Sequence, residues 1–287
     1  MLSHYMFTFL LNHKSSIIMS QKYILILSFA FITTSIFGQL SESPLHLVLQ
    51  KKQQNTKFEE SDLLQISTIS KAVESLGEEN AMHEVLRINS NQRSTILNEK
   101  PDAISIMLPF QGTEREVLLV KTNLFSDDFQ VTESATNRPV DVDLGVHYRG
   151  IIADDKTSIA ALSIYKDELI GLFSDSQNGN LVLGKLEGAN WINGEHVIYD
   201  DANILDNFEL DCGTEDGGIG YTREELQNNN GRALSDCVRF YFEVDNDITN
   251  SKGGTSGATN FVTGMYNQVA AIYSNENINP VISEIFV

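Results

Sequence analysis

The hydrophobic pattern between residues 104 and 199 consists of short runs rich in β-branched and aromatic residues. Turn formers such as Gln111-Gly112 and Asn137-Arg138-Pro139 separate these runs. Such alternation of apolar runs and turns predicts strands and is typical of an antiparallel β domain. The predicted strands cover residues 104–110, 116–125, 158–165, 168–174, 180–186 and 196–199.

The stretch before this β region, residues 40–100, is polar and mostly compatible with helix. Its clearest pattern lies at 61–77, where apolar residues recur at helical spacing and the run stops at Gly77. Apolar residues three and four positions apart line one face of a helix, and glycine commonly follows a helix end. We therefore expect a helical arm leading into the β domain.

The last stretch has a third pattern. Residues 238–244 alternate as a strand does, residues 258–277 carry a helical stripe, and residues 281–287 form another β-rich run. The apolar stripe consists of Phe261, Val262, Met265, Tyr266, Val269, Ile272 and Tyr273. Strand, helix and strand predict the opening of a parallel α/β sheet. Two strands with open edges would not be stable alone, so we expect this sheet to be incomplete.

Residues 211–236 separate the two patterns and contain few large apolar side chains. They are acidic and then rich in glycine and asparagine, a composition typical of a linker open to proteases. The resulting map has a β domain with its helical lead-in at 39–210, a linker at 211–236 and an α/β piece at 237–287. The expected fold class is α+β overall.

The N-terminus resembles an export signal. A short basic start at Met19 to Lys22 precedes an apolar run at 23–37 and the small residue Gly38. This is the order of a secretory signal peptide, which predicts cleavage near Gly38, transit through a bacterial periplasm and secretion. The run is too short to cross a bilayer comfortably, so we expect no membrane span after cleavage. Residues 1–18 precede the signal and are interpreted as a start-site extension.

The net charge of −19 changes the picture of possible partners. Nucleic acids and anionic membranes are polyanions that recruit lysine and arginine, so neither is an expected partner. Acidity also favours solubility outside the cell.

No complete active site is present in the sequence. The histidines show no helical zinc pair, and the chain has neither a nucleophile elbow nor a phosphate-binding loop. His147, beside a turn at Gly145, is interpreted as a hydrogen-bonded structural histidine. We therefore assign no catalytic and no cofactor-binding residue within these 287 residues.

Cys212 is the strongest candidate for chemistry. It lies in a polar segment where its thiolate would be free to bind zinc. The alternative is a disulfide with Cys237, the only other cysteine, which would close a loop of 24 residues. The two roles exclude each other, and both remain open from the residues alone.

Two regions together resemble a known family. The segments CVRFYFEVDNDI from 237, ATNFVTGMYNQVAAIYSNENI from 258 and VISEIFV from 281 resemble the first strand, first helix and second strand of secreted reprolysin-like (adamalysin-type) zinc metalloproteases. The segments FSDDFQV from 125, HYRGIIADDKTSIAALSIYKDELIGLF from 147 and NLVLG from 180 are similar to the propeptide of that family.

The resemblance implies a latent zymogen. The β domain would be an inhibitory propeptide, followed by an incomplete α/β (βαβ) zincin-type catalytic domain. Cys212-Gly213 matches the pair whose thiolate binds the catalytic zinc in such zymogens, although the residues before it depart from the usual basic or proline pattern. Arg232-Ala233 is the expected processing site.

The family's H-E-x-x-H-x-x-G-x-x-H motif does not occur in the chain. The resemblance therefore implies a missing C-terminal catalytic half in cis, which would bind zinc and cleave peptide or protein substrates. This chain alone is expected to hold no zinc and to be inactive. The alternatives are a secreted β-sandwich binding or adhesion module without catalysis, and a free-standing inhibitor acting in trans.

Overall fold

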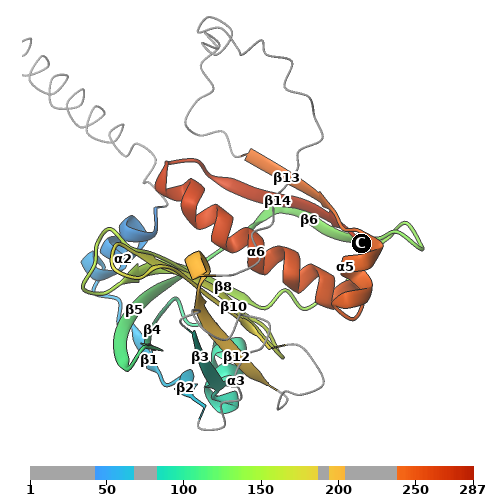
Figure 1. Cartoon of the computed structure of the whole chain (residues 1–287). Helices are drawn as coiled ribbons and strands as arrows, with labels where there is room; N and C mark the ends of the chain where they lie inside the picture. Colours follow the sequence, from blue (N-terminus) through green and yellow to red (C-terminus); the bar gives the residue numbers. More distant parts are fainter. Residues whose placement is uncertain (1–42, 68–82, 187–193, 204–237) are drawn as a thin grey trace, which may run out of the picture. The chain divides into compact units, whose positions relative to one another are not determined.

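A ten-stranded sheet contains most of the predicted β region (Figure 1). The structure is a computed structural model that describes residues 43–67, 83–186, 194–203 and 238–287. Along the sheet the strand order is β1-β4-β5-β8-β9-β10-β11-β12-β3-β2. All pairs are antiparallel except β1 with β4, so the expectation of a mainly antiparallel sheet is confirmed.

The strands of this sheet are β1 (Glu59–Ser61), β2 (Leu64–Ile66), β3 (His83–Ile88), β4 (Ala103–Phe110), β5 (Thr113–Thr122), β8 (Val146–Ile152), β9 (Ile159–Ile164), β10 (Leu169–Asp175), β11 (Gly179–Lys185) and β12 (Glu195–Asp200). Strands β2 and β3, at one end of the order, also contact β4 near the other end, so the sheet curls. One apolar core runs along its concave side, from Leu63 and Leu86 to Ile104, Leu162 and Phe173.

A second sheet has four strands in the order β13-β14-β6-β7. They are β13 (Val238–Glu243), β14 (Pro280–Phe286), β6 (Phe125–Glu133) and β7 (Arg138–Val140). Strand β14 is parallel to both β13 and β6, and β7 is antiparallel to β6. The expected parallel βαβ unit is therefore present. The expectation of at most two strands was wrong, because β6 and β7 leave the region of the large sheet and extend the smaller one.

The helices are α2 (Pro44–Gln53), α3 (Ser90–Glu99), α5 (Asn246–Ser251) and α6 (Thr255–Asn275), with a short 3-10 turn η2 (Asp201–Asn203). Helix α6 joins β13 to β14 and lies between the two sheets (Figure 1). It contacts β8, β9 and β10 of the large sheet and β14 of the small one. Chain positions more than a hundred residues apart therefore meet along α6.

The helix predicted at 61–77 is corrected by the structure over its first part. Residues 61–67 include the end of β1 and all of β2, and residues 68–77 lie outside the described part of the chain. Leu63 and Leu64 are buried in the core, and β2 pairs with β3 through backbone hydrogen bonds. Strand pairing and burial outweigh helical spacing over so short a run, because intrinsic propensity is a weak preference.

Strands β3, β6, β7 and β8 and helix α5 were not predicted. Strand β8 is the informative case, because all seven of its residues are buried although two of them, His147 and Arg149, are polar. Two ionisable side chains interrupt the apolar run that normally marks a central strand. Their burial is explained by the contact that β8 makes with α6.

Candidate functional site

The residues predicted to carry chemistry lie outside the described residues. This holds for Cys212 and Cys237, for the expected processing residue Arg232 and for Gly38 at the end of the signal. The choice between a zinc-binding Cys212 and a disulfide therefore stays a prediction. Among the residues that the structure describes, no three histidine, cysteine, aspartate or glutamate side chains gather as a group that could hold a metal ion.

The most unusual feature of the described residues is a cluster of polar side chains buried between α6 and the large sheet. We call it the buried polar cluster, and it consists of His147, Arg149, Ser163 and Tyr165 from the sheet side and Thr263, Asn267 and Ser274 from α6. Each of these side chains is at most 4% exposed. Polar groups so deeply buried are costly unless they are hydrogen-bonded, so their contacts define the site.

Arg149 links strand β8 to two positions of α6 within the buried polar cluster. From β8 its Nε donates to Oδ1 of Asn267 at 3.0 Å, and its Nη1 donates to Oγ of Ser274 at 3.0 Å. The two acceptors are seven positions apart, which is about two turns of helix and places them on the same face of α6. One guanidinium group therefore holds α6 at two points.

Asn267 also donates hydrogen bonds to the large sheet. Its Nδ2 donates to the backbone oxygen of Tyr148 at 3.2 Å and lies 3.2 Å from Oγ of Ser163. The Ser163 hydroxyl also lies 2.9 Å from Nδ1 of His147. Asn267 accepts from one strand residue and donates to two others, so its amide orientation is fixed by the network.

A second contact point lies further towards the N-terminus of α6. The hydroxyl groups of Tyr165 and Thr263 are 2.7 Å apart. Next to Thr263, Gly264 faces Ile170 on β10 so closely that an added Cβ would lie 2.5 Å from the Ile170 Cδ1 atom. Glycine permits this close approach, because an added Cβ would force the helix or the Ile170 side chain to shift.

The electrostatics of the cluster keep His147 neutral. Burial lowers the pKa of His147 to about 3, and the positive charge of Arg149 acts in the same direction. Burial also raises the pKa of Tyr165. The cluster therefore contains one permanent charge, on Arg149, surrounded by neutral donors and acceptors from α6. Such an arrangement suits orientation and holding of a helix rather than proton transfer.

The two faces of α6 differ in chemistry. Towards the large sheet it presents small and polar residues, which are Thr263, Gly264, Asn267, Ala271 and Ser274. Towards the small sheet it buries Ala258, Tyr266 and Ala270 in an apolar core with Ile282 and Ile285 of β14. The apolar stripe predicted from the sequence describes only part of this pattern. The signal that was missed is the run of small and polar residues at 263, 267 and 274.

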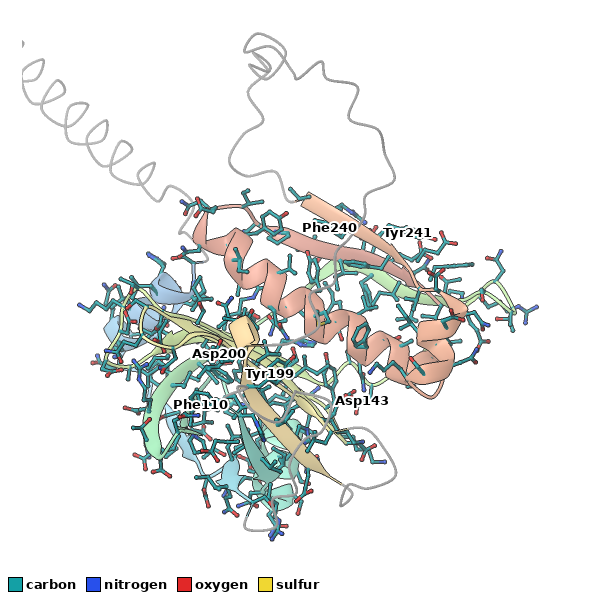
Figure 2. The ribbon with its side chains drawn as sticks, in the orientation of Figure 1. Phe110, Asp143, Tyr199, Asp200, Phe240 and Tyr241 are labelled. Atoms are coloured by element: carbon teal, nitrogen blue, oxygen red, sulfur yellow. The ribbon has the colours of Figure 1, made fainter. Side chains whose placement is uncertain are left out.

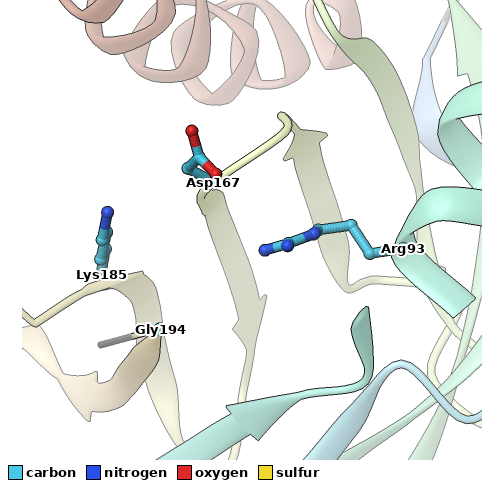
Figure 3. A pocket seen from close by; sticks show the side chains of 4 residues that line it. All are labelled: Arg93, Asp167, Lys185 and Gly194. Atoms are coloured by element: carbon cyan, nitrogen blue, oxygen red, sulfur yellow. The ribbon is translucent and has the colours of Figure 1, made fainter. Parts of the chain in front are cut away.

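A separate polar pocket lies beside helix α3 and strand β11 of the large sheet (Figure 3). Arg93 of α3, Lys185 of β11, Asp167 and Gly194 line its volume of about 460 Å³. Beside it, Nε2 of buried His196 accepts from the Leu169 backbone at 2.9 Å, and Nδ1 lies 3.0 Å from the Gly194 oxygen. Burial, together with the positive charges of Lys185 and Arg93, lowers the pKa of His196 to about 4. His196 is therefore a neutral structural histidine.

A scan against models of protein families finds no match to this chain, and a search of curated proteins finds none either. Within the described residues, none of the helices combines the length and apolar character that a membrane span requires.

Proposed function

We propose that this chain is the N-terminal part of a secreted, reprolysin-like zinc metalloendopeptidase zymogen. In this proposal residues 39–210 are a propeptide, and residues 237–287 are the first strand, helix and strand of the enzyme. The propeptide holds the enzyme latent, and the 287-residue chain is itself inactive because it contains no H-E-x-x-H motif.

The observation that supports this proposal is the polarity of α6. A helix that is permanently covered on both sides normally buries apolar residues on both. Here the face towards the large sheet carries hydroxyl and amide groups and a glycine, and its partners are the strands of the proposed propeptide. These groups can hydrogen-bond to water once the large sheet leaves, whereas the apolar face packs against Ile282 and Ile285 of β14 and also against Val131 of β6. The polar contact between α6 and the large sheet is therefore the part of the interface suited to separation.

Zinc enters the proposal only through residues that the structure does not describe. A tetrahedral zinc site requires three or four ligands, and the described residues provide no such group. The ligands would belong to the catalytic half in cis, with Cys212 as the proposed inhibitory ligand.

The test is to extend the coding sequence beyond Val287 and to assay the product. The proposal expects an open reading frame that reaches an H-E-x-x-H motif. It also expects peptidase activity that appears only after cleavage near Arg232 and that is lost with a zinc chelator. The Cys212→Ala variant should be active before cleavage, and Cys237→Ala provides the matched control. A stop codon directly after Val287 would reject the proposal.

A second candidate function is a secreted binding module without catalysis. The specific observation in its favour is that β6 and β7, from the proposed propeptide, belong to the same sheet as β13 and β14. Side chains support this junction, since Thr132 and Gln130 donate to Glu284 at 2.6 and 3.1 Å, and Arg239 pairs with Asp128 at 2.7 Å. A permanent module would have such a shared sheet.

One experiment separates the two candidates. The chain is cut between residues 211 and 236, and the products are passed over a gel-filtration column under native conditions. Fragments that separate in the absence of denaturant support the zymogen. Fragments that co-elute and separate only in urea support the permanent module.

A further inference from the structure

The polar pocket beside α3 and β11 is the starting point for a further inference. It is lined by Arg93 of α3, Lys185 of β11, Asp167 in the turn between β9 and β10, and Gly194 directly before β12. None of these residues belongs to the small sheet. Strand β12, labelled at Tyr199 in Figure 2, pairs with β11 and begins next to Gly194. The pocket volume of about 460 Å³ lies in the range of small-molecule sites.

Three of the lining side chains are charged, and none of them is neutralised by a neighbour. Among the described residues, Arg93, Lys185 and Asp167 take part in no salt bridge. Acidic residues outnumber basic ones by 39 to 20, so a basic side chain has many possible partners in this chain. Two cations that stay unpaired and face the same pocket therefore indicate a ligand that carries negative charge.

The packing of α3 directs Arg93 towards the pocket. The helix begins after the N-cap Asn89, whose backbone oxygen accepts from the Arg93 backbone nitrogen at 2.9 Å. Ile96 and Leu97 lie three and four positions further along and pack against the core of the large sheet. Residues three and four apart share a helix face, so the Arg93 side chain extends from the packed face of α3 and is half-buried.

A buried histidine holds the other walls in place. His196 lies opposite Lys185 in the register of β11 and β12, so the two side chains stand on the same face of the sheet. Its ring is hydrogen-bonded to the backbone of Leu169, two residues beyond Asp167, and to the oxygen of Gly194. The turn that carries Asp167 is thereby tied to the start of β12. A pocket whose walls are fixed before binding loses less entropy when it holds a ligand.

The order of the charges indicates which ligand fits. Figure 3 shows Asp167 between Lys185 and Arg93, so the pocket presents a positive, a negative and a positive group in turn. A simple dianion such as inorganic phosphate would be repelled by Asp167 and by the overall charge of −19. A ligand with one ammonium group and two carboxylates meets a group of opposite sign at each of its three charges.

We propose that this pocket binds an acidic amino acid of the aspartate or glutamate type. The planar guanidinium group of Arg93 holds one carboxylate in a bidentate pair, Lys185 holds the other, and Asp167 accepts from the amino group. Such a ligand adds only one net negative charge to an acidic protein. This proposal does not rest on the proposed function.

Isothermal titration calorimetry of the purified chain at low ionic strength tests the proposal, with L-glutamate and L-aspartate as probes. At least one of them should bind with a Kd of about 1 mM or lower, as expected for a few charge-assisted hydrogen bonds. Glutarate and succinate retain both carboxylates but lack the amino group, and L-glutamine and L-asparagine retain the amino group with one carboxylate. Each should bind at least about tenfold more weakly than the amino acid it resembles.

Substitutions test the role of each charge. Arg93→Gln and Lys185→Gln should each weaken the binding of the acidic amino acid at least about tenfold. Asp167→Asn should remove the preference for the amino acid over the dicarboxylate that lacks the amino group. The matched controls, which make the same changes at exposed positions outside the pocket, are Arg87→Gln, Lys156→Gln and Asp127→Asn. These controls should bind as tightly as the wild type.

Nuclear magnetic resonance locates the ligand without any substitution. Besides burial, the charges of Lys185 and Arg93 lower the pKa of His196, so both cations lie close enough to act on its ring. Saturating ligand should shift the ring signals of His196 and leave those of His147, in the buried polar cluster, in place. The proposal is overturned if neither amino acid binds at about 10 mM, or if the dicarboxylates bind the wild type equally well. Unchanged binding by Arg93→Gln, or unshifted His196 signals at saturation, would overturn it too.

Discussion

Arg149 of β8 and Asn267 of α6 are 118 positions apart in the chain, and their side chains meet at 3.0 Å in the interior of the protein. The hydrogen bond links an ionised donor to a neutral amide, a combination stronger than one between two neutral groups. It is the central contact of the buried polar cluster and the first place to test the role of that cluster.

The two single replacements of this pair should together cost more free energy of unfolding than the double replacement does. Arg149→Met leaves acceptors on α6 unsatisfied and should lower the free energy of unfolding by about 2–4 kcal/mol. Asn267→Leu removes a partner of a buried charge and should cost about 3–5 kcal/mol. The double variant should be more stable than the sum of the two losses predicts, by about 1–3 kcal/mol. Urea unfolding of the four proteins measures this coupling, and strict additivity would contradict it.

The close approach of α6 to β10 predicts a strong effect of one methyl group. In Gly264→Ala the added Cβ would also lie 3.0 Å from the Ile170 Cβ, so the helix must shift or the side chain must move. We expect a loss of about 1–3 kcal/mol, as for overpacked cores. Gly184→Ala on β11 is the control, because nothing lies within 4 Å of its added Cβ. Equal thermal stability of the two variants would show that α6 is not packed this tightly.

The two buried histidines predict that stability falls in mild acid. Their folded pKa values, about 3 for His147 and about 4 for His196, lie below the ordinary value of 6.5. Between the folded and ordinary values the unfolded chain binds more protons than the folded chain, so the free energy of unfolding rises with pH. The stabilisation is complete above pH 6.5 and is lost as the pH falls from there towards 4, on the order of 1.4 kcal/mol per pH unit for each histidine.

Urea unfolding between about pH 7 and pH 5 isolates this effect, since most carboxylates stay ionised in that range. The double variant His147→Gln/His196→Gln retains an acceptor and a donor at each site and cannot titrate there. Its stability should change much less over the same range. A wild-type curve as flat as that of the double variant would contradict the assignment of neutral histidines.

The domain map predicts an order of proteolysis. Residues 211–236 should be cut first by a protease of broad specificity, and residues 39–210 should resist because their strands are paired. Mass spectrometry of the early fragments identifies the cut sites. Cleavage within the β4–β5 or β9–β10 hairpins before residue 211 would show that the map is wrong.

The sequence pattern predicted the α+β class, most strands of the large sheet and the unit formed by β13, α6 and β14. These elements have strong periodicity and follow one another in the chain. It did not predict that β6 joins β14, because parallel pairing between distant segments depends on tertiary contacts such as those of Glu284. The buried polar cluster was missed for a similar reason. Thr263 and Asn267 would ordinarily be assigned to an exposed helix face, and only the position of Arg149 shows that they are covered.

The junction of β6 with β14 also bears on how the protein acquires its fold. The residues that meet there, Gln130 and Glu284, are separated by 154 positions, so β6 is synthesised long before its parallel partner. Until β14 arrives, the β6–β7 hairpin has an open edge, and contacts between such distant segments form slowly. A chaperone would meet the protein in that half-paired state, in which the open edge of this hairpin is exposed to aggregation during synthesis.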